Sequence, residues 1–109
     1  MNLFLTVDGV VSISEMMLAE ALCIDERIIK TCVESFKEDE ERFSYNFFEK
    51  TCVLVEEGIE TEFMQRRMTL EGVMFIIGFL DKNFFPIRDS EIRMIQKHYA
   101  RALNNKEVK

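Results

Sequence analysis

The chain has 109 residues, of which 48% are hydrophobic, with ten Phe, seven Met, four Gly and one Pro. This size and composition predict one hydrophobic core and exclude a low-complexity or disordered chain. The longest apolar stretch, residues 70–80, is far shorter than the ~20 residues of a membrane span, and no basic and apolar leader opens the chain. We therefore expect one cytoplasmic domain over residues 1–104, with a polar tail at residues 105–109.

Charge is divided unevenly along the chain, whose formal net charge is −6. Residues 1–62 hold 15 acidic and 5 basic side chains, a net of −10, and residues 63–109 hold 5 acidic and 9 basic, a net of +4. Such a molecule can attract a charged partner or pair with copies of itself. The alternative is two solvated faces that differ by chance, because surface charge is a weak signal of function.

The first residues have the pattern of a β-hairpin. Asp8-Gly9 lies between two β-prone runs, which is typical of a type I′ turn. Ser12 followed by Glu15 fits a capping box, in which the serine accepts a hydrogen bond from a free helix N–H and the glutamate reaches back. The pattern predicts a short helix over about residues 14–22.

A second, amphipathic helix is predicted after a break at residues 23–25. Asp25 is a good N-cap, and the apolar residues that follow recur at helical spacing. These apolar residues are Ile28, Ile29, Cys32, Val33 and Phe36. The helix is expected to end in residues 37–42, which include an acidic run that is typical of a solvated surface. The acidic run is Glu38, Asp39, Glu40 and Glu41.

A second hairpin is predicted next, followed by a buried helix. The β-branched run at residues 51–55 and a turn at Glu57-Gly58 precede an alternation of polar and apolar residues that reaches Met68. Thr69 is expected to cap a very apolar helix over residues 70–80, which we expect at the centre of the core.

The last predicted helix begins at Asp89 or Ser90, after a loop over residues 81–87 that contains Pro86, and ends near Asn104. Its apolar face consists of Ile92, Ile95, Tyr99 and Leu103. Three bases spaced four residues apart lie on the opposite face: Arg93, Lys97 and Arg101. They could follow a phosphate backbone or meet the acidic run of a second copy.

The expected fold class is α+β and mostly helical, with a helix-turn-helix-like pair, small β-hairpins and two further helices. Two helices joined by a tight break and followed by a ribbon have the order of a winged helix, although such a pair is often mere packing. If the protein binds DNA, the candidate contact residues are Arg27, Lys30, Thr31, Arg66 and Arg67. The helix-pair residues are weak base readers, and the acidic run after them would repel phosphate.

Enzymatic chemistry finds little support in the sequence. His98 is the only histidine, and no serine or cysteine lies near it at a spacing that suggests an activated nucleophile. The chain has no glycine-rich phosphate loop, and the acidic run lacks the interleaved glycine of a calcium loop. We expect no catalytic residues, no cofactor and no metal.

The sulfur-containing residues are expected in the core. Three cysteines, odd in number and scattered among apolar neighbours, predict buried thiols of a reducing compartment. They are Cys23, Cys32 and Cys52. Four methionines fall on apolar helix faces, so that packing is a better interpretation than an adaptable binding groove. They are Met16, Met17, Met74 and Met94.

Two stretches of the chain resemble phage regulatory proteins of the Rha and antirepressor type. The first spans residues 11–36, and the second runs from Met68-Thr69-Leu70-Glu71-Gly72-Val73, which leads into the apolar helix, to the closing residues 95–103; measured from end to end, the two stretches cover a little over half the chain. The first contains Ser12-Ile13-Ser14-Glu15-Met16 and Arg27-Ile28-Ile29-Lys30. The resemblance implies a small α+β regulatory domain that alters transcriptional control by contacting DNA or a repressor. The turn Leu22-Cys23-Ile24-Asp25-Glu26 departs from the basic turn common in those proteins, which weighs against direct DNA reading.

Three functions are compatible with these patterns. The first is a regulatory module that contacts a repressor or other host or phage regulator through its acidic first half, as a homo-oligomer. The second is a winged-helix DNA-binding regulator. The third is an acidic inhibitor that mimics nucleic acid.

Overall fold

The structure, a computed structural model, describes residues 2–37 and 45–107. The chain opens with strands β1 (Leu5–Val7) and β2 (Val10–Ser14), which pair in antiparallel fashion. Asp8 and Gly9 join them with φ angles of 51° and 80°, as a type I′ turn requires. The predicted first hairpin is confirmed.

Helix α1 (Glu15–Leu22) follows β2 without a loop. Its N-cap is Ser14, whose Oγ accepts a hydrogen bond from the N–H of Met17 at 3.2 Å. The predicted capping box is therefore wrong, because Ser12 belongs to β2 and its side chain is buried in the interior. The helix boundaries were placed correctly, but the capping residue lies two positions later.

Helix α2 (Glu26–Ser35) is separated from α1 by a tight turn. Cys23 has a left-handed backbone, and its N–H donates to the carbonyl of Glu20, which closes α1. Asp25 caps α2 as predicted, since its Oδ1 accepts from the N–H of Arg27 at 2.8 Å. The helix ends at Ser35, before the predicted range of residues 37–42, and the acidic run Glu38 to Glu41 lies outside the described residues.

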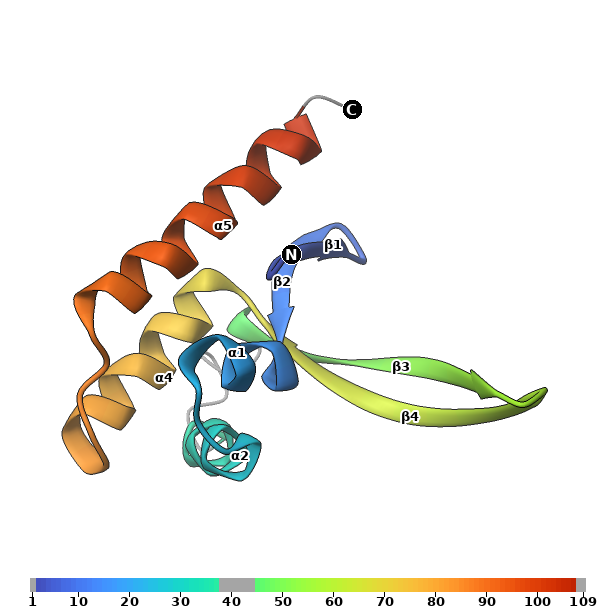
Figure 1. The fold of residues 1–109 in the computed structure, drawn as a ribbon, viewed down its shortest axis with the longest axis horizontal. Coiled ribbons are helices and arrows are strands. Elements are labelled where there is room, and N and C mark those ends of the chain that lie inside the picture. Colours follow the sequence, from blue (N-terminus) through green and yellow to red (C-terminus); the bar gives the residue numbers. More distant parts are fainter. Residues whose placement is uncertain (1, 38–44, 108–109) are drawn as a thin grey trace.

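The second predicted hairpin is confirmed by strands β3 (Phe47–Glu56) and β4 (Ile59–Met68). Glu57 and Gly58 form its turn with φ angles of 52° and 78°. Ile13 and Ser14 of β2 pair with Met68 and Arg67 at the base of β4. The result is one antiparallel sheet with the strand order β1-β2-β4-β3, in which the two hairpins diverge from this short junction (Figure 1).

Two further helices complete the fold. The N-cap of α4 (Leu70–Asn83) is Thr69, as predicted, whose Oγ1 accepts from the N–H of Gly72 at 3.2 Å. Helix α5 (Asp89–Glu107) begins where expected but extends three residues past Asn104. Residues 105–107 are therefore helical and do not belong to a separate tail.

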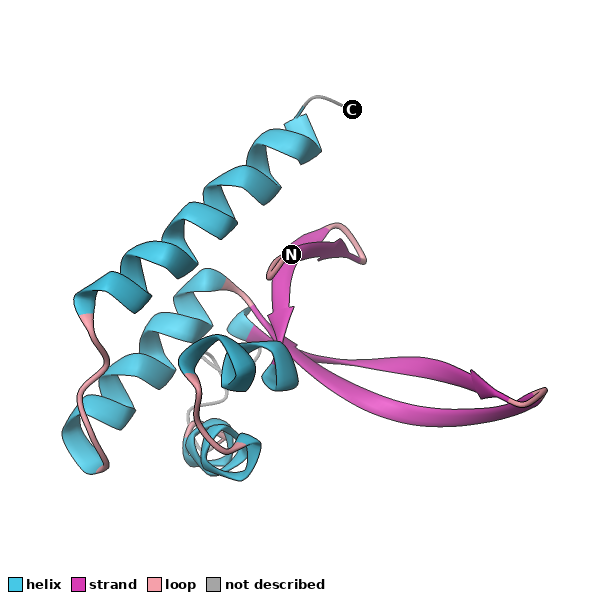
Figure 2. Ribbon diagram, in the orientation of Figure 1, coloured by secondary structure: helices cyan, strands magenta, loops and turns pink. Residues whose placement is uncertain are grey.

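The core lies where the helices meet the proximal ends of the strands (Figure 2). Its largest fully buried side chains are Ile13, Leu18, Ile29, Met68, Ile76, Leu80 and Ile95. The fold class is α+β, as expected, and about half of the chain is helical. Core positions were wrongly assigned to Met16 and Met74, which are exposed, whereas Met17 and Met94 are partly buried against the core. None of the described helices combines the length and the apolar character needed to cross a membrane.

Candidate functional site

The outer part of the β3–β4 hairpin projects from the body of the molecule as a two-stranded ribbon (Figure 1). We call residues 51–64 the arm. Every side chain of the arm is exposed except that of Cys52, which is half-buried. Its exposed large apolar residues are Val53, Leu54, Val55, Ile59, Phe63 and Met64. Several large apolar side chains exposed on one element are typical of an interaction site.

Both faces of the arm carry apolar side chains. Residues paired directly across two antiparallel strands lie on the same face. The pairs Cys52↔Phe63 and Glu56↔Ile59 place one apolar cluster, with Leu54, on the first face. The second face consists of Thr51, Val53, Val55, Glu60, Glu62 and Met64. Within residues 2–37 and 45–107 no other element covers either face, so that both faces are exposed.

The charge of the arm is entirely negative. Four glutamates lie in it or at its tip, and residues 51–65 contain no Lys or Arg. The four are Glu56, Glu57, Glu60 and Glu62. A wing that follows a DNA backbone needs bases to neutralise phosphates. The arm therefore suits an apolar or basic surface better than a nucleic acid.

Arg66 ties the base of the arm to the helical pair. Its guanidinium lies 3.0 Å from Oε1 of Glu34 on α2, 3.7 Å from Oε2 of Glu15 on α1 and 3.9 Å from Oε1 of Glu49 on β3. These contacts span three elements and leave the Arg66 side chain mostly buried. We infer that they fix the angle at which the arm leaves the body.

The same cluster perturbs two carboxyl groups in opposite directions. Burial raises the pKa of Glu15, and the nearby charge of Arg66 opposes this effect only in part. Hydrogen bonds from Lys37 and Arg66 lower the pKa of Glu34. A cleft of about 180 Å³ beside the cluster is lined by Glu15, Lys30, Glu34, Glu49, Met64 and Arg66. Its carboxylates outnumber its bases, which makes it unsuitable for a phosphate.

Arg67 is an interior residue, although it was a candidate DNA contact. The residue is 4% exposed, and its Nε and Nη2 donate to Oγ and the carbonyl oxygen of Ser12, each at 2.8 Å. Its Nη1 donates to Oε1 of Gln65. Burial lowers the pKa of Arg67. Its guanidinium stabilises the junction of β2 with β4 and is not offered to a phosphate.

The exposed candidates on α2 already have partners. Arg27 lies 2.8 Å from Asp25, and Lys30 lies 3.8 Å from Glu26. Hydrogen bonds from Arg27 lower the pKa of Asp25 to about 2. The hydroxyl of Thr31 donates to the carbonyl of Arg27. The structure brings these candidates together on one exposed side of α2, where carboxylates offset their charge.

The basic row on α5 is separate from both α2 and the arm. Arg93, Lys97 and Arg101 are exposed, and none of them forms an ion pair with a described residue. Helix α5 lies beyond α4, on the side of the molecule away from α2 (Figure 1). The row is an accessible positive surface. Its proposed acidic counterpart, Glu38 to Glu41, is not among the described residues.

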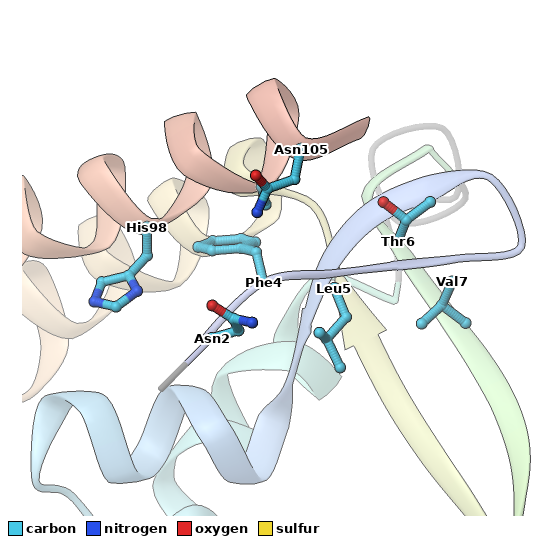
Figure 3. A pocket seen from close by; sticks show the side chains of 8 residues that line it. Asn2, Phe4, Leu5, Thr6, Val7, His98 and Asn105 are labelled. Carbon is cyan, nitrogen blue, oxygen red and sulfur yellow. The ribbon is translucent and has the colours of Figure 1, made fainter. Parts of the chain in front are cut away.

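A shallow pocket of about 520 Å³ separates β1 from α5 (Figure 3). His98, Ala102 and Asn105 line it from the helix, and Asn2 and residues 4–7 line it from the N-terminal segment. The lining includes no carboxylate and no thiol, and its one side-chain hydroxyl is that of Thr6. Across the part of the chain that is described, no three His, Cys, Asp or Glu side chains gather to hold a metal ion.

The three thiols are free in the structure but differ in exposure. Cys32 is buried, Cys52 is half-buried and Cys23 is exposed. The expectation that all three are buried is therefore wrong for Cys23, which lies in the exposed turn between α1 and α2. Burial raises the pKa of Cys32 to about 11.

Comparison with protein-family models, with curated proteins and with solved structures found no match to this chain.

Two features of the site were not expected from the sequence. The first is the Arg66 cluster, which joins residues up to 51 positions apart in the sequence. The second is the exposure of the arm, which depends on where the body of the fold ends. One signal for the second feature was present, because a hairpin about Glu57-Gly58 places Val53 and Val55 on the same face as Glu60 and Glu62. A strand that covers a core has one polar and one apolar face.

Proposed function

We propose that this chain is a regulatory protein-binding module, of the kind that its resemblance to phage antirepressor-type proteins implies, and that it contacts a repressor or another regulator. The observation that carries the proposal is the arm. It presents six large apolar side chains and four glutamates, with no base to meet a phosphate. Apolar surface rimmed by charge is the composition of a protein-binding patch.

The helical pair supports the same conclusion. In a helix-turn-helix protein the second helix enters the major groove with side chains free to reach base edges. Here Arg27 and Lys30 are engaged by Asp25 and Glu26, and Glu34 projects from the same helix. Presenting this face to DNA would place three carboxylates near the phosphates, which is unfavourable.

A winged-helix DNA-binding regulator is the second candidate. The order of the elements favours it, because α1 and α2 are joined by a tight turn and the β3–β4 hairpin comes next, where a wing would be. The accessible row Arg93, Lys97 and Arg101 would supply its phosphate contacts. The composition of the arm and of α2 makes us rank it second.

A salt titration of DNA binding separates the two candidates. Anisotropy of a labelled duplex is measured with the intact chain at about 50 mM and about 200 mM salt, since phosphate contacts make affinity fall steeply over this range. For a protein-binding module we expect no affinity tighter than roughly 10⁻⁶ M, the upper end of non-specific binding. Tighter, steeply salt-dependent binding that is lost in the variant Arg93→Glu, Lys97→Glu would put the DNA-binding function first.

A further inference from the structure

The outer strand of the sheet has an open edge along the arm. β3 is the last strand in the order β1-β2-β4-β3, and it pairs only with β4 among the described strands. The type I′ turn makes Glu56↔Ile59 a hydrogen-bonded pair, and such pairs alternate along an antiparallel ribbon. Thr51, Val53 and Val55 therefore direct their backbone N–H and C=O groups away from β4, toward the open edge.

Natural sheets usually protect such an edge with lysines, proline, a bulge or a covering element. Residues 51–56 contain no lysine or proline and pair regularly with β4, and none of the described elements covers their outer edge. Their sequence is Thr-Cys-Val-Leu-Val-Glu. Val53 and Val55 are 53% and 60% exposed. A long, exposed apolar edge is a template for another strand.

We propose that this edge binds a second copy of the chain, with the two β3 strands antiparallel about a two-fold axis at Val53. The edge is complementary to itself in this register. Val53 faces Val53 of the second copy, Thr51 faces Val55, and Cys52 faces Leu54. At each end Lys50 faces Glu56, so that opposite charges meet twice.

Charge selects this register over its neighbours. With the axis at Leu54, Lys50 would face the turn residue Gly58, and Glu56 would face Cys52. With the axis at Cys52, Lys50 would face Leu54, and Glu56 would face Phe48. Of the three axes, only that at Val53 places Lys50 opposite Glu56, and opposite charges directly across two strands stabilise a sheet. The same register places Glu49 opposite the turn residue Glu57, and this like-charge pair opposes part of that gain.

The backbone pattern fits the same register. Val53 and the pair Thr51↔Val55 all direct their polar groups outward, so that they become the hydrogen-bonded pairs of the new ladder. Lys50 and Glu56 then form a pair without hydrogen bonds, in which side chains approach more closely. Lys50 already lies 3.0 Å from Asp8 at the tip of the first hairpin, but both side chains are well exposed and the contact is weak. Lys50 therefore loses little when it exchanges Asp8 for Glu56 of the second copy.

Single cysteines at the edge test the register directly. In the full chain with Cys23→Ser and Cys52→Ser, the variant Val53→Cys places two thiols across the axis with Cα atoms about 5.5 Å apart, within the range of a disulfide. The matched control Val55→Cys has the same residue type, face and exposure, but its two copies lie about 14 Å apart. We expect rapid disulfide dimers for Val53→Cys and slow ones for Val55→Cys. Equal rates, or no dimer from either variant, would overturn the proposal.

Charge exchange provides a second, independent test on the folded chain. Glu56→Lys and Lys50→Glu each replace two attractive contacts by two repulsive ones, so that each should raise the dimer dissociation constant roughly tenfold in sedimentation equilibrium. The double variant Lys50→Glu, Glu56→Lys restores both contacts and should return the constant close to that of the unchanged chain. A monomer under all conditions, or a double variant no tighter than the single ones, contradicts the proposal.

Self-association through β3 and the binding of a regulator are contradicted by different experimental results. A chain that stays monomeric and shows no tight DNA affinity would still be a protein-binding module, but one whose arm serves another partner. A dimer with tight, salt-dependent DNA binding would retain the β3 interface and overturn the proposed function.

Discussion

Gly9 and Gly58 hold the same position in two type I′ turns, with φ angles of 80° and 78°, and a Cβ at either would meet open space. The effect of a side chain there is backbone strain alone. We expect Gly9→Val to lower the free energy of unfolding by about 1 kcal/mol or more, because it strains the hairpin that contains buried Val11 and Ile13. Gly58→Val should have a much smaller global effect, since the arm can open without disturbing the core. Urea unfolding of both variants checks this, and equal effects would contradict it.

Glu15 should give the stability a pH dependence of unusual sign. Its pKa is raised by burial, so that the native state holds its proton at a pH where the unfolded chain has released it. This group therefore destabilises the fold as pH rises above the ordinary glutamate pKa. We expect the stability of Glu15→Gln relative to the unchanged chain to increase as pH is raised from 4 to 7.

Comparison of Glu15→Gln with the unchanged chain separates the pH dependence due to Glu15 from that due to Asp25 and Glu34. The pKa values of these two groups are lowered, so that their contribution is lost as pH falls. Urea unfolding at several pH values measures the difference. A difference that is flat or of opposite sign would show that Arg66 fully compensates the buried charge.

The cysteines should react at very different rates. Cys23 is exposed, whereas Cys32 is fully buried with a pKa raised to about 11, which leaves little thiolate at neutral pH. We expect a thiol reagent at pH 7.5 to modify Cys23 quickly and Cys32 only on unfolding. Titration in denaturant without reductant should count three thiols. A count of one would reveal an intramolecular disulfide and exclude the reduced state.

At the scale of elements, the arm should be removable without loss of the fold. Cys52↔Phe63 is a hydrogen-bonded pair like Glu56↔Ile59, so that replacing residues 53–62 by Asn-Gly closes the ribbon with the same turn type. No deleted residue belongs to the core. We expect a melting temperature within about 2 °C of the intact chain, since surface changes have small effects on stability. Thermal unfolding measures this, and a shift of 10 °C would show that the arm packs on the body.

The two turns and the caps of α2 and α4 could be predicted from the sequence because their chemistry is local, whereas the cap of α1 was assigned to Ser12 instead of Ser14. Asp8-Gly9 and Glu57-Gly58 specify type I′ turns through positive φ angles, and Asp25 and Thr69 accept from backbone N–H groups two or three residues later. Such signals lie within a few residues of their effect. They place the strands and helices to within a few residues without knowledge of the remaining fold.

The positions of individual side chains could not be predicted, because they depend on distant parts of the chain. Arg67 has the sequence appearance of a surface base, but pairing of β4 with β2 buries it against Ser12, 55 positions away. Met16 lies on an apolar helix, but the face that contacts the core includes Leu18 and Leu22 and leaves Met16 exposed. The exposure of the arm follows likewise from the length of β3 and β4 relative to the body.

At the scale of the molecule, the positive surface of α5 should dominate contacts with polyanions. We expect the double variant Arg93→Glu, Lys97→Glu to elute from a heparin column at lower salt than the unchanged chain. Its circular dichroism and dimer mass should stay the same, because both residues are exposed and lie on α5, away from β3 (Figure 1). Arg27→Glu, Lys30→Glu is the control with the same change in net charge, since Asp25 and Glu26 already offset those two charges. An equal shift for both variants would show that net charge alone controls elution.

The regular pairing of β3 with β4 also limits how this protein can change in length. Each residue pair adds about 3.4 Å of reach and turns the next side chains to the opposite side. Relatives whose ribbons differ by an even number of pairs would keep the same residues toward a given surface, whereas an odd number would exchange the two sides. The arm is therefore a spacer that can be lengthened or shortened in steps of about 7 Å while the interior of the protein stays unaltered.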